Sequence, residues 1–185
     1  MIEDALSTAE GKMQKAVEAL KRDLITIRTG RASPGLVDRL TVDYYGVPTP
    51  LNQMATVTAP EARLLVIQPW DRRLLPTIEK AILKSDLGLN PASDGSLIRL
   101  AIPQLTEERR RELVKVVRKK VEEGKVAVRN IRREAADDLK EMEKEKAISE
   151  DDHHRALERL QKQTDRFTAE VDKTGEQKTA ELMEV

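Results

Sequence analysis

The side chains that could support catalysis are few in this chain of 185 residues. No cysteine is present, which excludes a thiol nucleophile and thiolate metal ligands. The two histidines, His153 and His154, are adjacent, so on a helix they would point about 100° apart and could not hold one metal ion together. The segment Gly30–Gly35 lacks the lysine and the spacing of a phosphate-binding loop. We therefore predict a protein that is not an enzyme, with no catalytic residues, no metal site and no cofactor.

Basic side chains gather in one stretch. Residues 109–133 include eleven basic and three acidic residues, a net charge of +8, whereas residues 134–185 carry a net charge of −7. The zero net charge of the whole chain therefore conceals two opposed fields. Seven of the eleven cations are arginines, whose planar guanidinium groups bind phosphate oxygens through paired hydrogen bonds. Two interpretations remain open: contact with a nucleic-acid backbone, or a solvated helix face with i,i+4 ion pairs.

If this stretch is helical, its charges would also separate by side. One flank of the apolar face would be basic, with Arg118, Lys125, Arg129 and Arg132, and the other would be acidic, with Glu112, Glu123 and Glu134. The chain has only four aromatic residues, so base stacking has little to build on. A nucleic acid would therefore be recognised by its shape and backbone.

Proline placement predicts the division of the chain. All eight prolines fall between Pro34 and Pro103. Because a proline inside a helix costs about 3 kcal/mol, only the flanking stretches can form long helices. The composition predicts an α+β protein in which a small domain, residues 30–105, is inserted into a helical domain made of residues 1–29 plus 106–185.

Apolar residues recur every three or four positions in both flanks, which predicts three amphipathic helices in an elongated bundle. The first helix would end at Gly30, a residue type favoured after helix C-termini. The second would run to Lys146, and the third would begin at Ser149, which is typical of an N-cap. The seam of the third helix would pass through Thr174 and Lys178. The short break between the last two helices predicts that they are antiparallel.

The middle of the chain predicts a small β/α/β domain. Strands are expected at 40–44, 54–58, 64–67 and 97–102, and a helix at 74–84. The run at 64–67 has four apolar residues in succession, which is typical of a strand buried on both faces. The stretches 30–33 and 103–105 would connect this domain to the bundle, and they predict a hinge.

The hydropathy of the chain predicts its cellular location. No apolar run approaches the ~20 residues of a membrane span. The first ten residues lack the apolar core of a secretory signal. We expect a soluble, cytoplasmic monomer that does not bind membranes.

Several segments are specific enough to suggest a family. They are residues 26–34 (TIRTGRASP), 43–51 (DYYGVPTPL), 85–91 (SDLGLNP), 103–110 (PQLTEERR) and 128–133 (VRNIRR). In this order, and over the full length of the chain, they resemble the ribosome recycling factor family. The resemblance implies an L-shaped molecule: an antiparallel three-helix bundle with an inserted β/α/β domain on a flexible hinge. The hinge residues that it implies are Gly30, Arg31, Ala32, Gln104 and Leu105.

The resemblance also implies a role after translation termination. Members of the family bind the large subunit of the post-termination ribosome, with the bundle against ribosomal RNA. Elongation factor G with GTP then pushes the inserted domain, and the ribosome separates into subunits. Arginines of the bundle would contact the RNA; the matching residues are Arg28, Arg31, Arg110, Arg129, Arg132 and Arg133.

From the residues alone, a second class of protein stays open. A helical scaffold or adaptor protein could use its charged flanks to pair with a complementary coiled coil, with no ribosome binding. The two hypotheses differ in one measurable property. Only phosphate contact predicts an affinity for ribosomes that falls steeply as the salt concentration rises.

Overall fold

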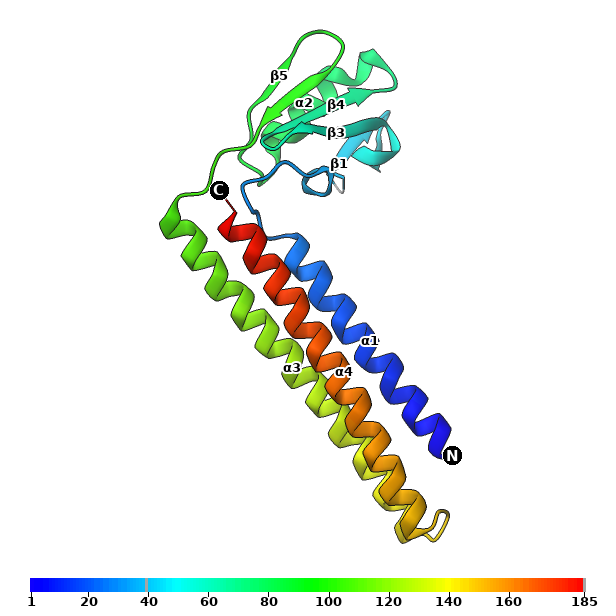
Figure 1. Cartoon of the computed structure of the whole chain (residues 1–185). Coiled ribbons are helices and arrows are strands. Elements are labelled where there is room, and N and C mark those ends of the chain that lie inside the picture. The colour runs from blue at the N-terminus through cyan, green and yellow to red at the C-terminus, as the bar shows by residue number, and fades with distance from the viewer. Residues whose placement is uncertain (39, 185) are drawn as a thin grey trace. The chain divides into compact units, whose positions relative to one another are not determined.

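The computed structural model describes residues 1–38 and 40–184, which form two compact units (Figure 1). One unit contains Met1–Ile27 and Glu108–Val185, and the other is the intervening segment, Arg28–Glu107. Each unit has an apolar core of its own.

Three helices form the first unit: α1 (Ile2–Ile25), α3 (Glu107–Lys144) and α4 (Glu150–Met183). They lie side by side as a bundle (Figure 1). The predicted apolar stripes face inward, which confirms the interpretation of the periodicity. The buried residues of α1 are Leu6, Ala9, Met13, Val17, Leu20 and Leu24, and those of α3 include Leu113, Val117, Val128, Ala135 and Leu139.

The α3 helix is antiparallel to the other two. A short turn reverses the chain between α3 and α4 (Figure 1). By contrast, α1 and α4 are parallel, because Glu3 pairs with Arg159 and Glu10 pairs with Arg166 in the same order along both helices. Both pairs are exposed and screened by solvent, so apolar packing contributes more than they do to holding the bundle together.

The turn between α3 and α4 is closed by local hydrogen bonds. Lys146 has a φ of 61°, and the N–H of Ala147 donates to the carbonyl oxygen of Met142 at 2.9 Å. Ser149 caps α4 as predicted, since its Oγ accepts a hydrogen bond from the N–H of Asp152 at 3.0 Å.

Gly175 allows α3 and α4 to approach each other closely. A Cβ atom added at Gly175 would lie 2.3 Å from Cγ2 of Val121, whereas one added at Gly124 would lie 3.4 Å from Cγ1 of Val171, an ordinary van der Waals distance. Gly175 is buried, whereas Thr174, which the sequence placed in the seam, is half-buried. The glycine is therefore the residue that contacts α3 here.

The second unit is built on a four-stranded antiparallel sheet. The strand order is β3 (Ala55–Glu61), β4 (Leu64–Pro69), β6 (Ile98–Ala101) and β5 (Pro91–Ser93). The helix α2 (Leu75–Lys84) shares one buried cluster with this sheet. Three short 3-10 turns, Pro34–Leu36, Leu51–Gln53 and Arg72–Leu74, contribute further side chains. The cluster includes Val37, Val42, Leu51, Leu65, Ile67, Ile78, Ile82, Ile98 and Leu100.

A separate two-stranded hairpin, β1 (Thr41–Tyr44) with β2 (Val47–Pro50), completes the second unit. Its two-residue turn places Tyr45 at a φ of 49° and Gly46 at a φ of 86°. Positive φ at both positions is the geometry of the tight turn that suits hairpin twist. The sequence did not predict β2, because proline normally weakens a strand; at an edge, a missing N–H is tolerated.

The structure differs from the prediction at residues 64–67. This strand is buried on one face only: Leu65 and Ile67 point into the core, while Leu64 and Val66 are partly exposed. The single core of the unit lies on one side of the sheet, so continuous apolar sequence here does not mean burial on both faces. In the described ranges, no helix has the length and apolar character that a membrane crossing requires.

Candidate nucleic-acid interface

Four of the six arginines proposed for RNA contact lie on α3 in the bundle: Arg110, Arg129, Arg132 and Arg133. Arg133 is exposed and forms no hydrogen bond or ion pair with any residue in 1–38 or 40–184. Arg110 is half-buried, and its buried Nε has no partner in the same ranges. Arg129 Nη2 lies 2.9 Å from Oε1 of Glu122. A guanidinium has five N–H donors, so one such pair leaves donors available for a phosphate.

The predicted basic flank of α3 turns toward α4. Arg132 Nη1 donates to Oε1 of Gln161 at 3.3 Å, and Lys125 Nζ lies 2.5 Å from Oδ1 of Asp172. Arg118, on the same flank, is exposed and has no partner among the described residues. Ion pairs therefore neutralise only part of this flank, and the remaining positive charge faces solvent.

The other two arginines lie outside the bundle. The α1 helix ends at Ile25, before the predicted stop at Gly30. Arg28 and Arg31 consequently belong to the second unit, and Arg28 Nη2 donates to the carbonyl oxygen of Asp86 at 3.5 Å. Arg28 was expected in the bundle and lies in the second unit, because α1 ends before it; Arg31 lies in the unit to which its place in residues 30–105 assigned it.

The two predicted hinge segments meet within the second unit. Gly30 has a φ of 78°, and a Cβ atom there would lie 3.4 Å from both Cγ and the backbone nitrogen of Leu105. Gly30, Arg31, Gln104 and Leu105 are among the residues that line a cavity of about 100 Å³. The left-handed conformation favours glycine at this position.

Ala32, the fifth predicted hinge residue, is fixed in place. Its N–H donates to the carbonyl oxygen of Ala62 at 2.6 Å, and the N–H of Ile102 donates to that of Arg63 at 2.8 Å. Ala62 and Arg63 form the turn between β3 and β4. Both connectors are thus anchored on one tight turn, and Ala32 belongs to the sheet unit.

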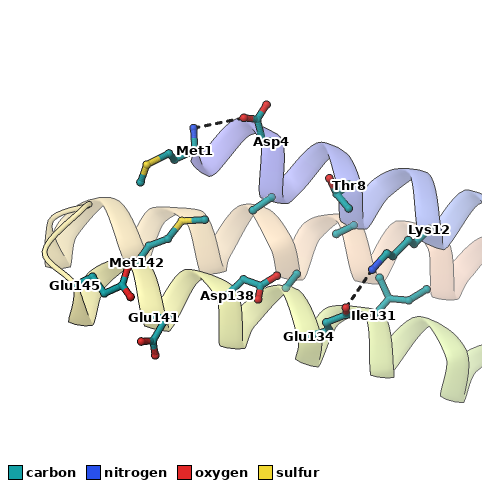
Figure 2. Close-up of a pocket in the computed structure, with 13 residues that line it drawn as sticks. Met1, Asp4, Thr8, Lys12, Ile131, Glu134, Asp138, Glu141, Met142 and Glu145 are labelled. Carbon is teal, nitrogen blue, oxygen red and sulfur yellow. Dashed lines mark hydrogen bonds and ion pairs between the residues drawn. The ribbon is translucent and has the colours of Figure 1, made fainter.

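Glu134, one of the three residues of the acidic flank of α3, faces α1 and borders a groove of about 460 Å³ (Figure 2). Lys12 on α1 forms an ion pair with Glu134 on α3, with Nζ and Oε1 3.1 Å apart. Beyond Glu134, further carboxylates continue the rim at steps of four, three and four residues, namely Asp138, Glu141 and Glu145. Sequence reasoning identified only the first member, although this spacing was visible in the sequence.

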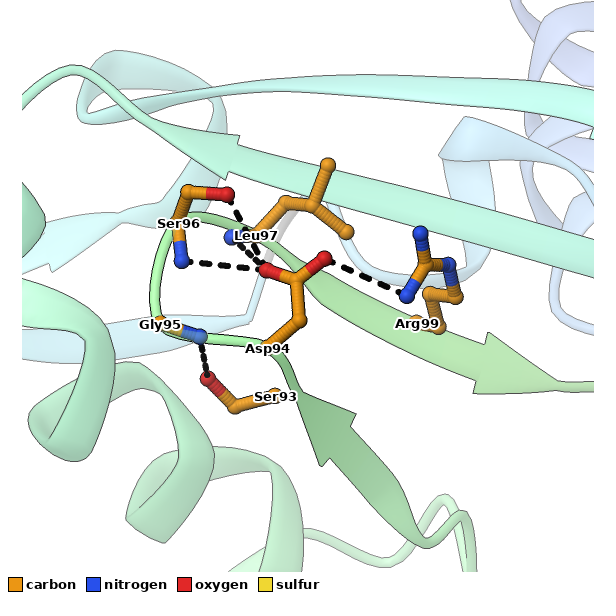
Figure 3. Close-up of polar contacts among 6 residues, drawn as sticks. All are labelled: Ser93, Asp94, Gly95, Ser96, Leu97 and Arg99. Carbon is orange, nitrogen blue, oxygen red and sulfur yellow. Dashed lines mark hydrogen bonds and ion pairs between the residues drawn. The ribbon is translucent and has the colours of Figure 1, made fainter.

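The most strongly shifted carboxylate has a structural role. Asp94 lies in the turn between β5 and β6, where its Oδ1 accepts hydrogen bonds from the N–H groups of Ser96 and Leu97, each at 3.0 Å (Figure 3). Its Oδ2 lies 3.2 Å from Nη1 of Arg99. These backbone hydrogen bonds, with the Ser96 hydroxyl and Arg99, lower the pKa of Asp94 to about 2. The carboxylate orders this turn.

In residues 1–38 and 40–184, no group of three or more His, Cys, Asp or Glu side chains is placed to hold an ion. His153 Nδ1 instead contacts a carboxylate oxygen of Glu143 across the α3–α4 turn.

Together, these features define a class of α+β proteins with two units. A small sheet unit is inserted after the first helix of a three-helix bundle, and the second helix of that bundle, α3, carries the arginines. Residues 20–183 match the family model described as ribosome recycling factor. The chain belongs to the ribosome recycling factor family.

Curated relatives and solved structures agree over the whole length. The ribosome-recycling factors of Moorella thermoacetica and Syntrophomonas wolfei are 63% and 58% identical, with each chain fully covered. A solution structure of the ribosome recycling factor matches with a TM-score of 0.80 at 48% identity, over 100% of this chain and 98% of that chain. The T. thermophilus factor, described with E. coli elongation factor G on the E. coli post-termination complex, matches with a TM-score of 0.70 at 50% identity, over 100% of both chains.

Proposed function

We propose that this chain binds the post-termination ribosome and, with elongation factor G and GTP hydrolysis by that factor, separates it into subunits for reuse. The observation that carries the proposal is the family membership, together with a relative at 50% identity described with elongation factor G on the post-termination complex. The chain itself is not an enzyme; the GTPase activity belongs to the elongation factor. It would act in the cytoplasm and as a monomer.

A subunit-splitting assay tests this function. Light scattering of purified post-termination ribosomes should fall only when the chain, elongation factor G and GTP are all present. Scattering that stays constant with all three would contradict the proposal. A fall with the chain and GTP but without the elongation factor would contradict the assignment of the GTPase to that factor.

Within this function, Arg110, Arg129, Arg132 and Arg133 of the bundle would hold ribosomal RNA by its phosphates, with Arg28 and Arg31 adding contacts from the second unit. Arg133 gives the cleanest test, because it is exposed and has no partner in the described ranges. A hydrogen bond from a charged group contributes about 1.5–3 kcal/mol, so Arg133→Ala should weaken ribosome binding about tenfold or more.

A matched control is Arg155→Ala. Arg155 is also exposed and without a partner in residues 1–38 and 40–184, but it follows the acidic first turn of α4, where the local field disfavours phosphate. Its removal should change ribosome affinity by less than about twofold. Both variants should keep the helical circular dichroism signal of the parent. Equal losses from both variants would argue against a specific role for Arg133.

We also place a hinge in the connectors outside the anchored positions Ala32 and Ile102, in residues 28–31 and 103–106. Because the chain has no cysteine, dyes can be attached to cysteines introduced at Lys15 and Glu61, one exposed position in each unit. Single-molecule energy transfer should show a broad or multiple distance distribution in the free protein. One narrow distribution would rule out hinge motion on the timescale of the measurement.

A further inference from the structure

The groove between α1 and α3 includes none of the arginines proposed for RNA contact. It lies on the flank of α3 opposite Arg132, which turns toward α4. Five carboxylates line it, namely Asp4, Glu134, Asp138, Glu141 and Glu145, against two cations. The cations are Lys12 and the amino group of Met1, which lies 3.9 Å from Oδ2 of Asp4. A nucleic-acid backbone would be repelled from such a rim. The ligand must therefore differ in charge from ribosomal RNA.

The floor of the groove is apolar and made mostly of small side chains. The lining includes Ala5 and Ala9 from α1 and Ile131, Ala135 and Met142 from α3. Ala9 and Ala135 are buried, but alanine has no atoms beyond Cβ, so the two helices leave a furrow of about 460 Å³ above them. This volume accommodates a few aliphatic side chains from another protein.

The rim shows which groups would flank those aliphatic side chains. The Lys12–Glu134 ion pair closes one end of the groove. Further along α3, Asp138, Glu141 and Glu145 are exposed, and their carboxylates form no hydrogen bond or ion pair with a residue in 1–38 or 40–184. From Glu134 to Glu145 the rim extends about 17 Å at ~1.5 Å per residue. That length matches three turns of a helix in the partner, with a cation on each turn.

We propose that this groove docks a basic amphipathic segment of a protein partner. Two or three aliphatic side chains of the segment enter the furrow over Ala5, Ala9 and Ala135. Lysines or arginines beside them pair with the free carboxylates of α3, as in helix-in-groove recognition. Met142 lies at the open end, and its flexible side chain can adapt to the segment.

Two synthetic helical peptides test the proposal against the full chain. Both carry leucines at i, i+3 and i+7; one is flanked by lysines and the other by glutamates. The lysine peptide should bind, as measured by fluorescence anisotropy, and should shift the methyl NMR signals of Ala5, Ala9 and Ala135. Its affinity should fall several-fold between 50 and 300 mM salt, as expected of exposed charges. The glutamate peptide should show at least tenfold weaker binding.

Variants locate the site. Asp138→Asn/Glu141→Gln/Glu145→Gln should reduce lysine-peptide affinity at least tenfold, and Ala5→Leu, which fills the furrow, should reduce it without changing the charge. The control Glu123→Gln/Glu176→Gln removes exposed acids outside the groove and should change affinity less than twofold.

Three results would overturn the proposal: equal binding of the two peptides, unchanged binding by the triple variant, or methyl shifts located elsewhere. A single-stranded RNA oligonucleotide that shifts the groove methyls more than the lysine peptide does would also overturn it. The outcome is independent of ribosome binding, because Arg133→Ala leaves the groove intact.

Discussion

Replacing Gly175 by alanine adds one methyl group where α4 packs against Val121 of α3. The new Cβ atom would lie 2.3 Å from Cγ2 of Val121, and the contact must lengthen to about 3.4 Å or more to become ordinary. Val121 cannot easily turn away, since one χ1 rotamer accounts for about 90% of helical valines. Either the helices move apart or a side chain becomes strained.

The cost can be bounded with a matched substitution. Overpacking a core typically costs about 1–3 kcal/mol, whereas exchanging glycine for alanine inside a helix gains about 1 kcal/mol. Gly11, in α1, is exposed, and a Cβ atom there would have no neighbour within 4 Å. Gly11→Ala should therefore raise the free energy of unfolding by about 1 kcal/mol. The free energy of unfolding of Gly175→Ala should be about 1–3 kcal/mol lower than that of Gly11→Ala, because the difference between the two isolates the steric cost at Gly175.

Urea unfolding followed by circular dichroism at 222 nm measures both variants. The pair Gly175→Ala/Val121→Ala adds a double-mutant cycle, because removing the valine methyl groups makes room for the new Cβ atom. The cycle should give a favourable coupling of about 1 kcal/mol or more. If Gly175→Ala stabilises the bundle as much as Gly11→Ala does, close packing at this glycine is refuted.

Three further predictions concern single side chains. Asp94→Ala should speed hydrogen exchange at the N–H of Leu97, which loses its acceptor. Because the pKa of the Asp94 carboxyl is lowered from 3.8 to about 2, the stability that it contributes is present above pH 3.8 and is lost as pH falls through about 2. An NMR titration of the carboxyl group measures this pKa. Lys178→Met should raise the free energy of unfolding of the bundle, measured in urea, by about 1 kcal/mol, because the ammonium group that it removes is half-buried. Burial lowers the pKa of Lys178, so the parent protein, unlike the variant, should gain stability as pH rises toward the pKa of an unfolded lysine. Gly30→Ala should destabilise the second unit by about 1–2 kcal/mol, because alanine is strained at the positive φ of this position. The fluorescence of the single tryptophan, Trp70, follows the unfolding of this unit. An unchanged unfolding midpoint would mean that the left-handed conformation is not required.

Most of the bundle could be predicted from the sequence, because helical periodicity and capping are local signals. The stripe of α1 and the Ser149 cap depend only on residues a few positions apart. Gly175 was not predicted, because its importance lies in Val121, far away in sequence. The short strand at Pro91–Ser93 was not predicted for a similar reason: its sequence has no strand pattern, and it is extended because it pairs with β6.

The candidate interface was partly predictable. Position on a helix placed Arg132 and Lys125 on one flank, and the structure adds that this flank turns toward α4. Arg28 could not be placed correctly, because the end of α1 has no strong stop signal before Gly30. The anchoring of Ala32 depends on a hydrogen bond to Ala62, which only the folded sheet brings near.

The salt dependence of ribosome binding tests the proposed RNA contact most directly. Co-sedimentation with ribosomes over a range of salt concentrations should give an affinity that falls linearly on a double-logarithmic plot, with a slope set by the number of phosphates contacted. Arg133→Ala should reduce the magnitude of that slope by about 1, and Arg155→Ala should leave it unchanged. An affinity that does not respond to salt, or a slope that Arg133→Ala leaves unaltered, would contradict phosphate binding by this helix.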